Sequence, residues 1–250
     1  MDNSSAAWLS RIGPKRPDKP VLIVFPHAGS GASAYQRWRG AAVSRVELFV
    51  VQLPGRETRR AEPLVTDLHS LVDPILTAFR NQAEGRDFAF LGHSVGSLSA
   101  LECARRLRAL GEPGPTAVGV SGFPAPHLPL PDLHKRTDDE ILAFLQEREY
   151  LPGKLSTQRG FLEMFLPVLK ADFRLAAGYR SREEDPLPCP LRAFGGLDDP
   201  FAGESDLAEW RRYAAAGSFS LTMLPGDHFY LYEHAAQVIE AVVAPPSFSD

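Results

Sequence analysis

Short apolar runs that alternate with helix-like segments constrain the fold of this chain more than any other feature. The first runs cover residues 21–25, 46–53 and 88–91, and they are rich in β-branched and aromatic side chains. An apolar run that ends at Pro or Gly is typical of a strand buried on both faces. Three further segments at residues 117–121, 191–194 and 219–224 are also predicted as strands, so we expect six strands.

The segments between these runs carry apolar residues at helical spacing. This pattern predicts helices over residues 33–44, 66–82, 95–110 and 234–243, and we expect Pro74 to kink or shorten the second of them. Strands that alternate with helices form parallel sheets through right-handed crossovers. The predicted fold class is therefore α/β, with a mostly parallel, doubly wound sheet.

One long stretch interrupts the alternation. Residues 123–190 contain helical patterns but no convincing strand, and a capping box from Thr137 to Glu140 begins one of these helices. An insertion of this size commonly covers the site at the strand ends. We expect a helical lid over residues 124–188 within a single domain of residues 1–250. The alternative is that these helices form the core of a second subdomain.

The composition is that of an ordinary globular protein. Of 250 residues, 44% are hydrophobic and 23% are charged, and the net charge of −4 comes without a basic block that would bind nucleic acid. Cys103 and Cys189 belong to no CxxC pair, so neither a zinc site nor a disulfide framework is predicted. No apolar run approaches the roughly 20 residues of a membrane span, and the start lacks a secretion-signal pattern. We expect a soluble, cytoplasmic protein.

Residues 92–96 read Gly-His-Ser-Val-Gly and follow a predicted strand directly. G-x-S-x-G between a strand and a helix is the nucleophile elbow of the α/β-hydrolase fold, in which a sharp turn exposes the serine hydroxyl. Ser94 is therefore the candidate nucleophile, and the Val95 N–H is a candidate oxyanion donor. The Gly-rich loop at residues 25–31 should supply the second donor, for which Ala28 is the candidate.

The acid and base of this fold follow the nucleophile in the order Asp or Glu, then His. His228 comes right after the last predicted strand, where the base belongs. Asp198 and Asp199 both follow the strand at 191–194; we favour Asp199 from its spacing before Pro200, and Asp198 remains open. A carboxylate there would accept the imidazole N–H and hold its tautomer.

The motifs together resemble those of the type II thioesterases, the stand-alone editing enzymes of polyketide and non-ribosomal peptide assembly lines. The resemblance covers nearly the whole chain. It is carried by Trp8-Leu9, residues 25–29, Leu53-Pro54-Gly55-Arg56, residues 92–96, Ser121-Gly122, Ala125-Pro126, Leu166-Pro167, Ala171-Asp172-Phe173, residues 196–200 and residues 226–229. Val95 differs from the Met or Leu usual after the nucleophile, which leaves the backbone donor in place.

The resemblance implies a substrate and a partner that the residue pattern alone does not. The substrate would be an acyl thioester on the phosphopantetheine arm of an acyl or peptidyl carrier protein, and no metal or organic cofactor would be needed. The apolar insertion suggests an acyl pocket lined partly by Phe161, Phe165 and Leu169. Three alternatives remain: a carboxylesterase or lipase with the same triad, an acyltransferase, and an inactive module that binds carrier domains.

Overall fold

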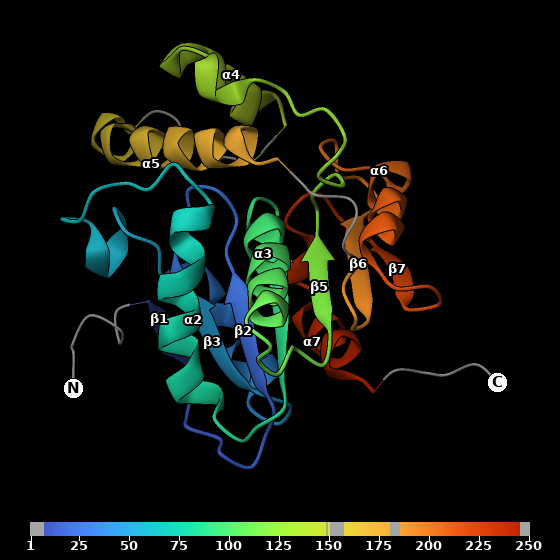
Figure 1. Ribbon diagram of the computed structural model, residues 1–250. Helices are drawn as coiled ribbons and strands as arrows, with labels where there is room; N and C mark the ends of the chain where they lie inside the picture. Colours follow the sequence, from blue (N-terminus) through green and yellow to red (C-terminus); the bar gives the residue numbers. More distant parts are fainter. Residues whose placement is uncertain (1–7, 149, 151–157, 181–185, 246–250) are drawn as a thin grey trace.

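The computed structural model describes residues 8–148, 150, 158–180 and 186–245, and within them a seven-stranded sheet forms the centre of the protein (Figure 1). The strand order is β1-β3-β2-β4-β5-β6-β7. All neighbouring pairs are parallel except β1 with β3, which is antiparallel. The strands are β1 (Leu9–Ile12), β2 (Val21–Phe25), β3 (Glu47–Val51), β4 (Phe88–His93), β5 (Val118–Ser121), β6 (Leu191–Gly196) and β7 (Phe219–Leu224).

Helices cover both faces of the sheet and one end of it (Figure 1). The α-helices are α1 (Arg39–Ala42), α2 (His69–Ala83), α3 (Gly96–Ala109), α4 (Asp138–Glu147), α5 (Arg159–Gly178), α6 (Glu204–Ala208) and α7 (Ala235–Val243). Short 3-10 helices lie at η2 (Ala32–Trp38), η3 (Glu57–Arg59), η4 (Leu133–Lys135), η5 (Glu209–Tyr213) and η6 (Tyr230–Tyr232). The predicted α/β fold class with a mostly parallel sheet is confirmed.

The side-chain alternation of the central strands separates two hydrophobic cores. Val21 and Ile23 of β2 point to the face covered by α2 and α3. Their neighbours Leu22 and Val24 point to the other face, where they pack with Trp38 of η2 and with α1 and α7. Because both faces of β2 are buried, its sequence is continuously apolar, which explains why the apolar runs predicted the strands so well.

Three local features differ from the predictions. The edge strand β1 was not predicted, because its sequence Leu-Ser-Arg-Ile is short and partly exposed, and only its pairing with β3 makes it a strand. Residues 33–44 were predicted as one helix but form η2 followed by the single turn of α1. Pro74 lies inside α2, which starts three residues later than predicted, at His69.

The segment between β5 and β6 carries α4 and α5, which lie beyond the carboxyl ends of the strands (Figure 1). The predicted capping box is present: Thr137 accepts from the Glu140 N–H, and the Glu140 carboxylate accepts from the Thr137 N–H. The two helices share a third apolar cluster that includes Ile141, Phe144 and Leu169. None of the helices in the described part of the chain is long and apolar enough to span a membrane.

Candidate active site

Ser94 occupies the turn between β4 and α3 in a strained conformation. Its φ is 52°, a left-handed value that a non-glycine residue rarely adopts, and its N–H donates to the Ser121 carbonyl at 2.7 Å. A side chain at Gly92 would collide with the Gly96 backbone, and one at Gly96 would collide with the Phe25 carbonyl. The two glycines therefore allow β2, β4 and α3 to approach closely enough to form the turn.

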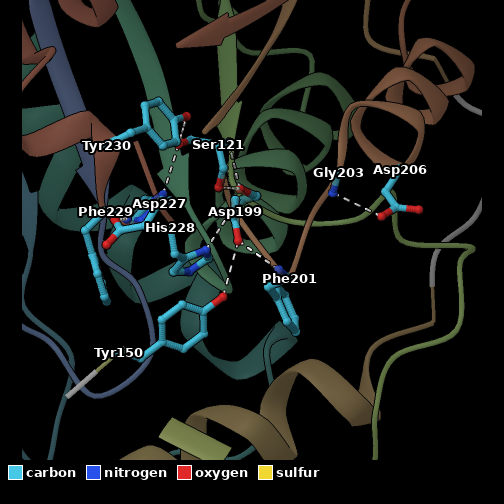
Figure 2. Close-up of polar contacts among 12 residues, drawn as sticks. Ser121, Tyr150, Asp199, Phe201, Gly203, Asp206, Asp227, His228, Phe229 and Tyr230 are labelled. Atoms are coloured by element: carbon cyan, nitrogen blue, oxygen red, sulfur yellow. Dashed lines mark hydrogen bonds and ion pairs between the residues drawn. The ribbon is translucent and has the colours of Figure 1, made fainter. Parts of the chain in front are cut away.

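His228 and Asp199 meet at the same edge of the sheet, although 29 positions separate them in the chain. Nδ1 of His228 lies 2.8 Å from Oδ2 of Asp199, and both side chains are buried. Oδ1 of Asp199 accepts from the Phe201 N–H at 2.9 Å and from the Tyr150 hydroxyl at 3.2 Å (Figure 2). Asp198 is exposed to solvent, so of the two candidate acids only Asp199 contacts His228.

Two further histidines lie beside His228 and are held in their neutral form. Burial lowers the pKa of His27 to about 4 and places the pKa of His93 well below its ordinary value. His27 Nε2 bonds the Tyr232 hydroxyl at 2.9 Å, and His93 Nδ1 bonds the Ser121 hydroxyl at 2.9 Å. The imidazole ring of His93 is centred 4.9 Å from that of His228. Neither neighbour opposes a positive charge on His228 at neutral pH.

Backbone N–H groups at the start of α3 and in the loop after β2 provide candidate oxyanion donors. In that loop the Gly29 N–H donates to Asp172 and the Ser30 N–H donates to the His27 carbonyl. The N–H groups of Ala28 and Val95 have no acceptor among the described residues, and both residues line the same cavity. Free backbone donors near a nucleophile are suited to holding an oxyanion.

Ser94 and His228 open into an apolar cavity of about 170 Å³. Of the three predicted pocket residues, Phe165 and Leu169 line it, whereas Phe161 does not and stacks on Phe165 with ring centroids 5.1 Å apart. Several lining residues were not predicted; some lie on α5 itself, and the others come from elements distant in the chain. The unpredicted lining residues include Phe123, Leu130, Pro131, Leu133, Phe144, Leu145, Tyr150, Phe173, Ala176, Ala177, Phe201 and Phe229.

Two residues that contact the His228–Asp199 pair were also not predicted to have a role. Tyr150 lies against His228, with ring centroids 4.9 Å apart, and no sequence signal marks it. Gly122 has φ 58° and lies directly beside both side chains. It belongs to a motif that carries the resemblance, which is the signal that could have drawn attention to it. A hydroxyl, an imidazole and free N–H donors around one cavity, with a carboxylate bonded to the imidazole, can perform nucleophilic acyl transfer.

Comparison with known proteins agrees with this geometry. A family model described as the thioesterase domain matches residues 20–244. The chain belongs to the thioesterase family. This thioesterase is 34% identical over 235 residues to the gramicidin S biosynthesis protein GrsT of Aneurinibacillus migulanus. The alignment covers 93% of this chain and 91% of GrsT. It is 36% identical over 234 residues to the thioesterase PikA5 of Streptomyces venezuelae, in an alignment that covers 92% of this chain and 82% of PikA5.

Solved structures extend the likeness from sequence to fold. The type II thioesterase BorB from the borrelidin biosynthetic cluster matches with a TM-score of 0.84 and 32% identity, over 94% of this chain and 96% of BorB. RedJ, a thioesterase from the prodiginine biosynthetic pathway in Streptomyces coelicolor, matches with a TM-score of 0.82 and 31% identity, over 92% of this chain and 94% of RedJ. The predicted resemblance to type II thioesterases is therefore confirmed, and the protein is a thioester hydrolase.

Proposed function

We propose that this thioesterase hydrolyses acyl thioesters from the phosphopantetheine arm of a carrier protein, as an editing enzyme of polyketide or non-ribosomal peptide biosynthesis. Ser94 is the nucleophile, His228 the general base and Asp199 the acid that orients it. The N–H groups of Ala28 and Val95 form the oxyanion hole. The observation that carries the proposal is that Ser94, His228, Ala28 and Val95 border one apolar cavity, into which an acyl chain would fit, while Asp199 contacts His228 from behind the cavity wall.

The proposed reaction passes through an acyl-enzyme. His228 removes the Ser94 proton while Oγ attacks the thioester carbonyl carbon, and the negative oxygen of the tetrahedral intermediate accepts from the two N–H groups. The C–S bond then breaks, and the thiolate leaves with the proton from His228. A water molecule, deprotonated by His228, attacks the acyl-enzyme. The acid is released and the proton returns to Ser94. Asp199 stabilises the imidazolium in both halves without itself being protonated.

The relatives favour a carrier-bound substrate over a simple ester. GrsT is named for gramicidin S biosynthesis, and BorB is a type II thioesterase of a biosynthetic cluster. Enzymes of this kind meet their acyl groups as thioesters on carrier proteins, so the present enzyme would act in the cytoplasm beside such carriers. In the same proposal the chain is one domain, and residues 124–188 are a lid whose helix α5 supplies Phe165 and Leu169 to the cavity wall.

Hydrolysis of an acetyl-loaded carrier protein tests the proposal, with the released acid measured by mass spectrometry. We expect release by the wild type and by Ser99→Ala, because Ser99 lies on α3 but does not line the cavity. We expect none from Ser94→Ala. The same acyl group is offered in parallel as a simple alcohol ester, and kcat/KM should be larger for the carrier thioester.

Each alternative function has its own result in this experiment. Cleavage of the alcohol ester alone would favour a carboxylesterase or lipase. An amide or ester product formed with an added amine or alcohol acceptor would favour an acyltransferase. If a fluorophosphonate failed to modify Ser94 and no ester were cleaved, the chain would be a binding module for carrier domains.

A further inference from the structure

A buried ion pair joins the loop after β3 to the helix α5. Arg56 Nη1 lies 2.7 Å from Oδ2 of Asp172, and Nη2 lies 2.8 Å from Oδ1, so the contact is bidentate. The side chains are only 5% and 3% exposed, and 116 positions separate them in the sequence. Neither residue lines the cavity that contains Ser94.

Both partners of this ion pair also hold the loop that contains Ala28. Oδ2 of Asp172 accepts from the Gly29 N–H at 2.7 Å, and Nη1 of Arg56 donates to the Ser30 carbonyl at 3.1 Å. Gln52 adds a third attachment, because its side chain accepts from the Ala32 N–H and donates to the Arg56 carbonyl. The loop is thus fixed at Gly29, Ser30 and Ala32, directly after the candidate oxyanion donor.

The conformation of Gly29 sets the direction of its own N–H group. Its φ of 77° lies in the left-handed region, and a Cβ there would come within 2.5 Å of the Phe165 ring. In this conformation the Gly29 N–H points at Asp172 and is not available to a substrate. The Ala28 N–H, one residue earlier, is left as a donor without an acceptor among the described residues.

Stability alone is a weak reason for such an ion pair. Removing two charges from water costs free energy that their attraction often only balances, and a well-packed apolar pair would often serve as well. A guanidinium with two parallel bonds to a carboxylate fixes geometry as well as charge. Here the ion pair also bonds Gly29 and Ser30 in the loop that contains Ala28. Orientation of that loop therefore explains the ion pair more directly than stability does.

We propose that Arg56 and Asp172 are positioning residues for the oxyanion hole, which hold the Ala28 N–H in its catalytic orientation and couple that orientation to α5. The inference rests on the proposed function. Since α5 also carries Phe165 and Leu169 on the cavity wall, the same helix shapes the acyl pocket and sets one oxyanion donor. The ion pair touches no reacting atom and acts only through the loop.

The test compares Asp172→Asn and Arg56→Lys with Glu47→Gln. Glu47 is a matched control, because it is 2% exposed, is paired with Arg11 and Arg86, and begins β3 at the opposite end of the sheet. The substrate is an acyl N-acetylcysteamine thioester, which needs no carrier protein. We measure kcat and KM, the pH profile of kcat/KM, and the affinities for a trifluoromethyl ketone and for the product acid, below the melting temperature of each variant.

We expect kcat to fall by about 10- to 100-fold in both variants, below the 10²- to 10³-fold loss that follows deletion of a donor. The trifluoromethyl ketone forms an oxyanion with Ser94, so its affinity should fall by the same factor. KM, the affinity for the product acid and the pH profile should stay close to wild type, because substrate binding and His228 are untouched. Glu47→Gln should keep the wild-type kcat.

Wild-type kcat and ketone affinity in Asp172→Asn would overturn the inference, as would an equal loss in Glu47→Gln. If Asp172→Asn does not fold, Arg56→Lys decides in the same way, because it keeps the positive charge while losing the bidentate geometry. A wild-type enzyme that does not cleave the thioester at all would instead contradict the proposed function, which separates the two failures.

Discussion

Gly122 gives the sharpest mutational test of the geometry around His228. Its φ of 58° is left-handed, and a Cβ added there would lie 3.0 Å from Cε1 of His93, 3.3 Å from Cε1 of His228 and 3.4 Å from Oδ2 of Asp199. The first two distances are tighter than ordinary van der Waals contact, so Gly122→Ala must displace at least one imidazole. A shift of about 1 Å at a catalytic group can reduce the rate about 10²-fold.

The strain of the backbone itself must be separated from this crowding. A left-handed alanine costs roughly 1–2 kcal/mol, which lowers Tm by roughly 2–8 °C in a chain of this size. Gly111, after α3, provides the control: its φ is 68°, and a Cβ there would meet no atom within 4 Å. We therefore expect Gly111→Ala to lose about this much stability and keep its activity, whereas Gly122→Ala loses at least as much stability and also loses activity.

Thermal melting followed by circular dichroism measures the first quantity, and kcat for a thioester substrate measures the second. The assay temperature must lie well below both melting points, so that a change in the folded fraction does not contribute. A Gly122→Ala enzyme with wild-type kcat would refute the argument that the His228–Asp199 pair lies against this glycine and depends on its missing side chain. Equal loss of activity in Gly111→Ala would refute it as well.

Three other predictions follow from the same site. Tyr150→Phe removes the hydroxyl that donates to Asp199, and loss of this one hydrogen bond to a charged acceptor should lower kcat/KM by about tenfold; an unchanged kcat/KM would contradict this. Burial lowers the pKa of His27 to about 4, so as the pH falls the unfolded chain takes up this proton before the folded protein does. The free energy of unfolding should therefore decrease below about pH 6.5, by up to about 3 kcal/mol at pH 4. Denaturant melts at several pH values should show a weaker dependence of this free energy on pH in His27→Gln. Phe165→Ala should raise kcat/KM for longer acyl chains relative to acetyl, by about fourfold for each newly buried methylene, whereas Phe161→Ala, outside the cavity wall, should change this ratio much less.

The central parallel strands could be predicted because a strand buried on both faces has a continuous run of apolar residues. In β2, for example, Leu22 and Ile23 point to opposite faces of the sheet and each packs in a hydrophobic core, so both are apolar. The edge strand β1 lacks that signal, since Arg11 is exposed and forms an ion pair with Glu47 of the neighbouring strand. Residues 33–44 gave a helical pattern, but most of them form the 3-10 helix η2, whose Tyr35 and Trp38 pack in the core on one face of the sheet.

Some residues of the candidate site are marked by a local sequence motif, whereas others are brought together only by the tertiary structure. Ser94 and His228 could be proposed from motif and chain order, because each follows a strand whose end the sequence marks. The choice between Asp198 and Asp199 depends on how one turn directs two adjacent side chains, and the sequence left it open. Tyr150 reaches Asp199 across 49 positions, and no periodicity encodes such a contact.

The two candidate oxyanion donors show why this division matters for catalysis. The Val95 N–H belongs to the elbow itself, where the strained Ser94 and the start of α3 fix its direction through backbone geometry. The Ala28 N–H belongs to a loop without regular secondary structure, so its direction depends on contacts with other elements. One such contact is the hydrogen bond from the neighbouring Gly29 N–H to Asp172 on α5. A donor held by a distant side chain is more sensitive to remote substitution than one held by its own turn. We therefore expect substitutions along α5 to alter catalysis through the Ala28 side of the oxyanion hole and to leave the Val95 side as it is.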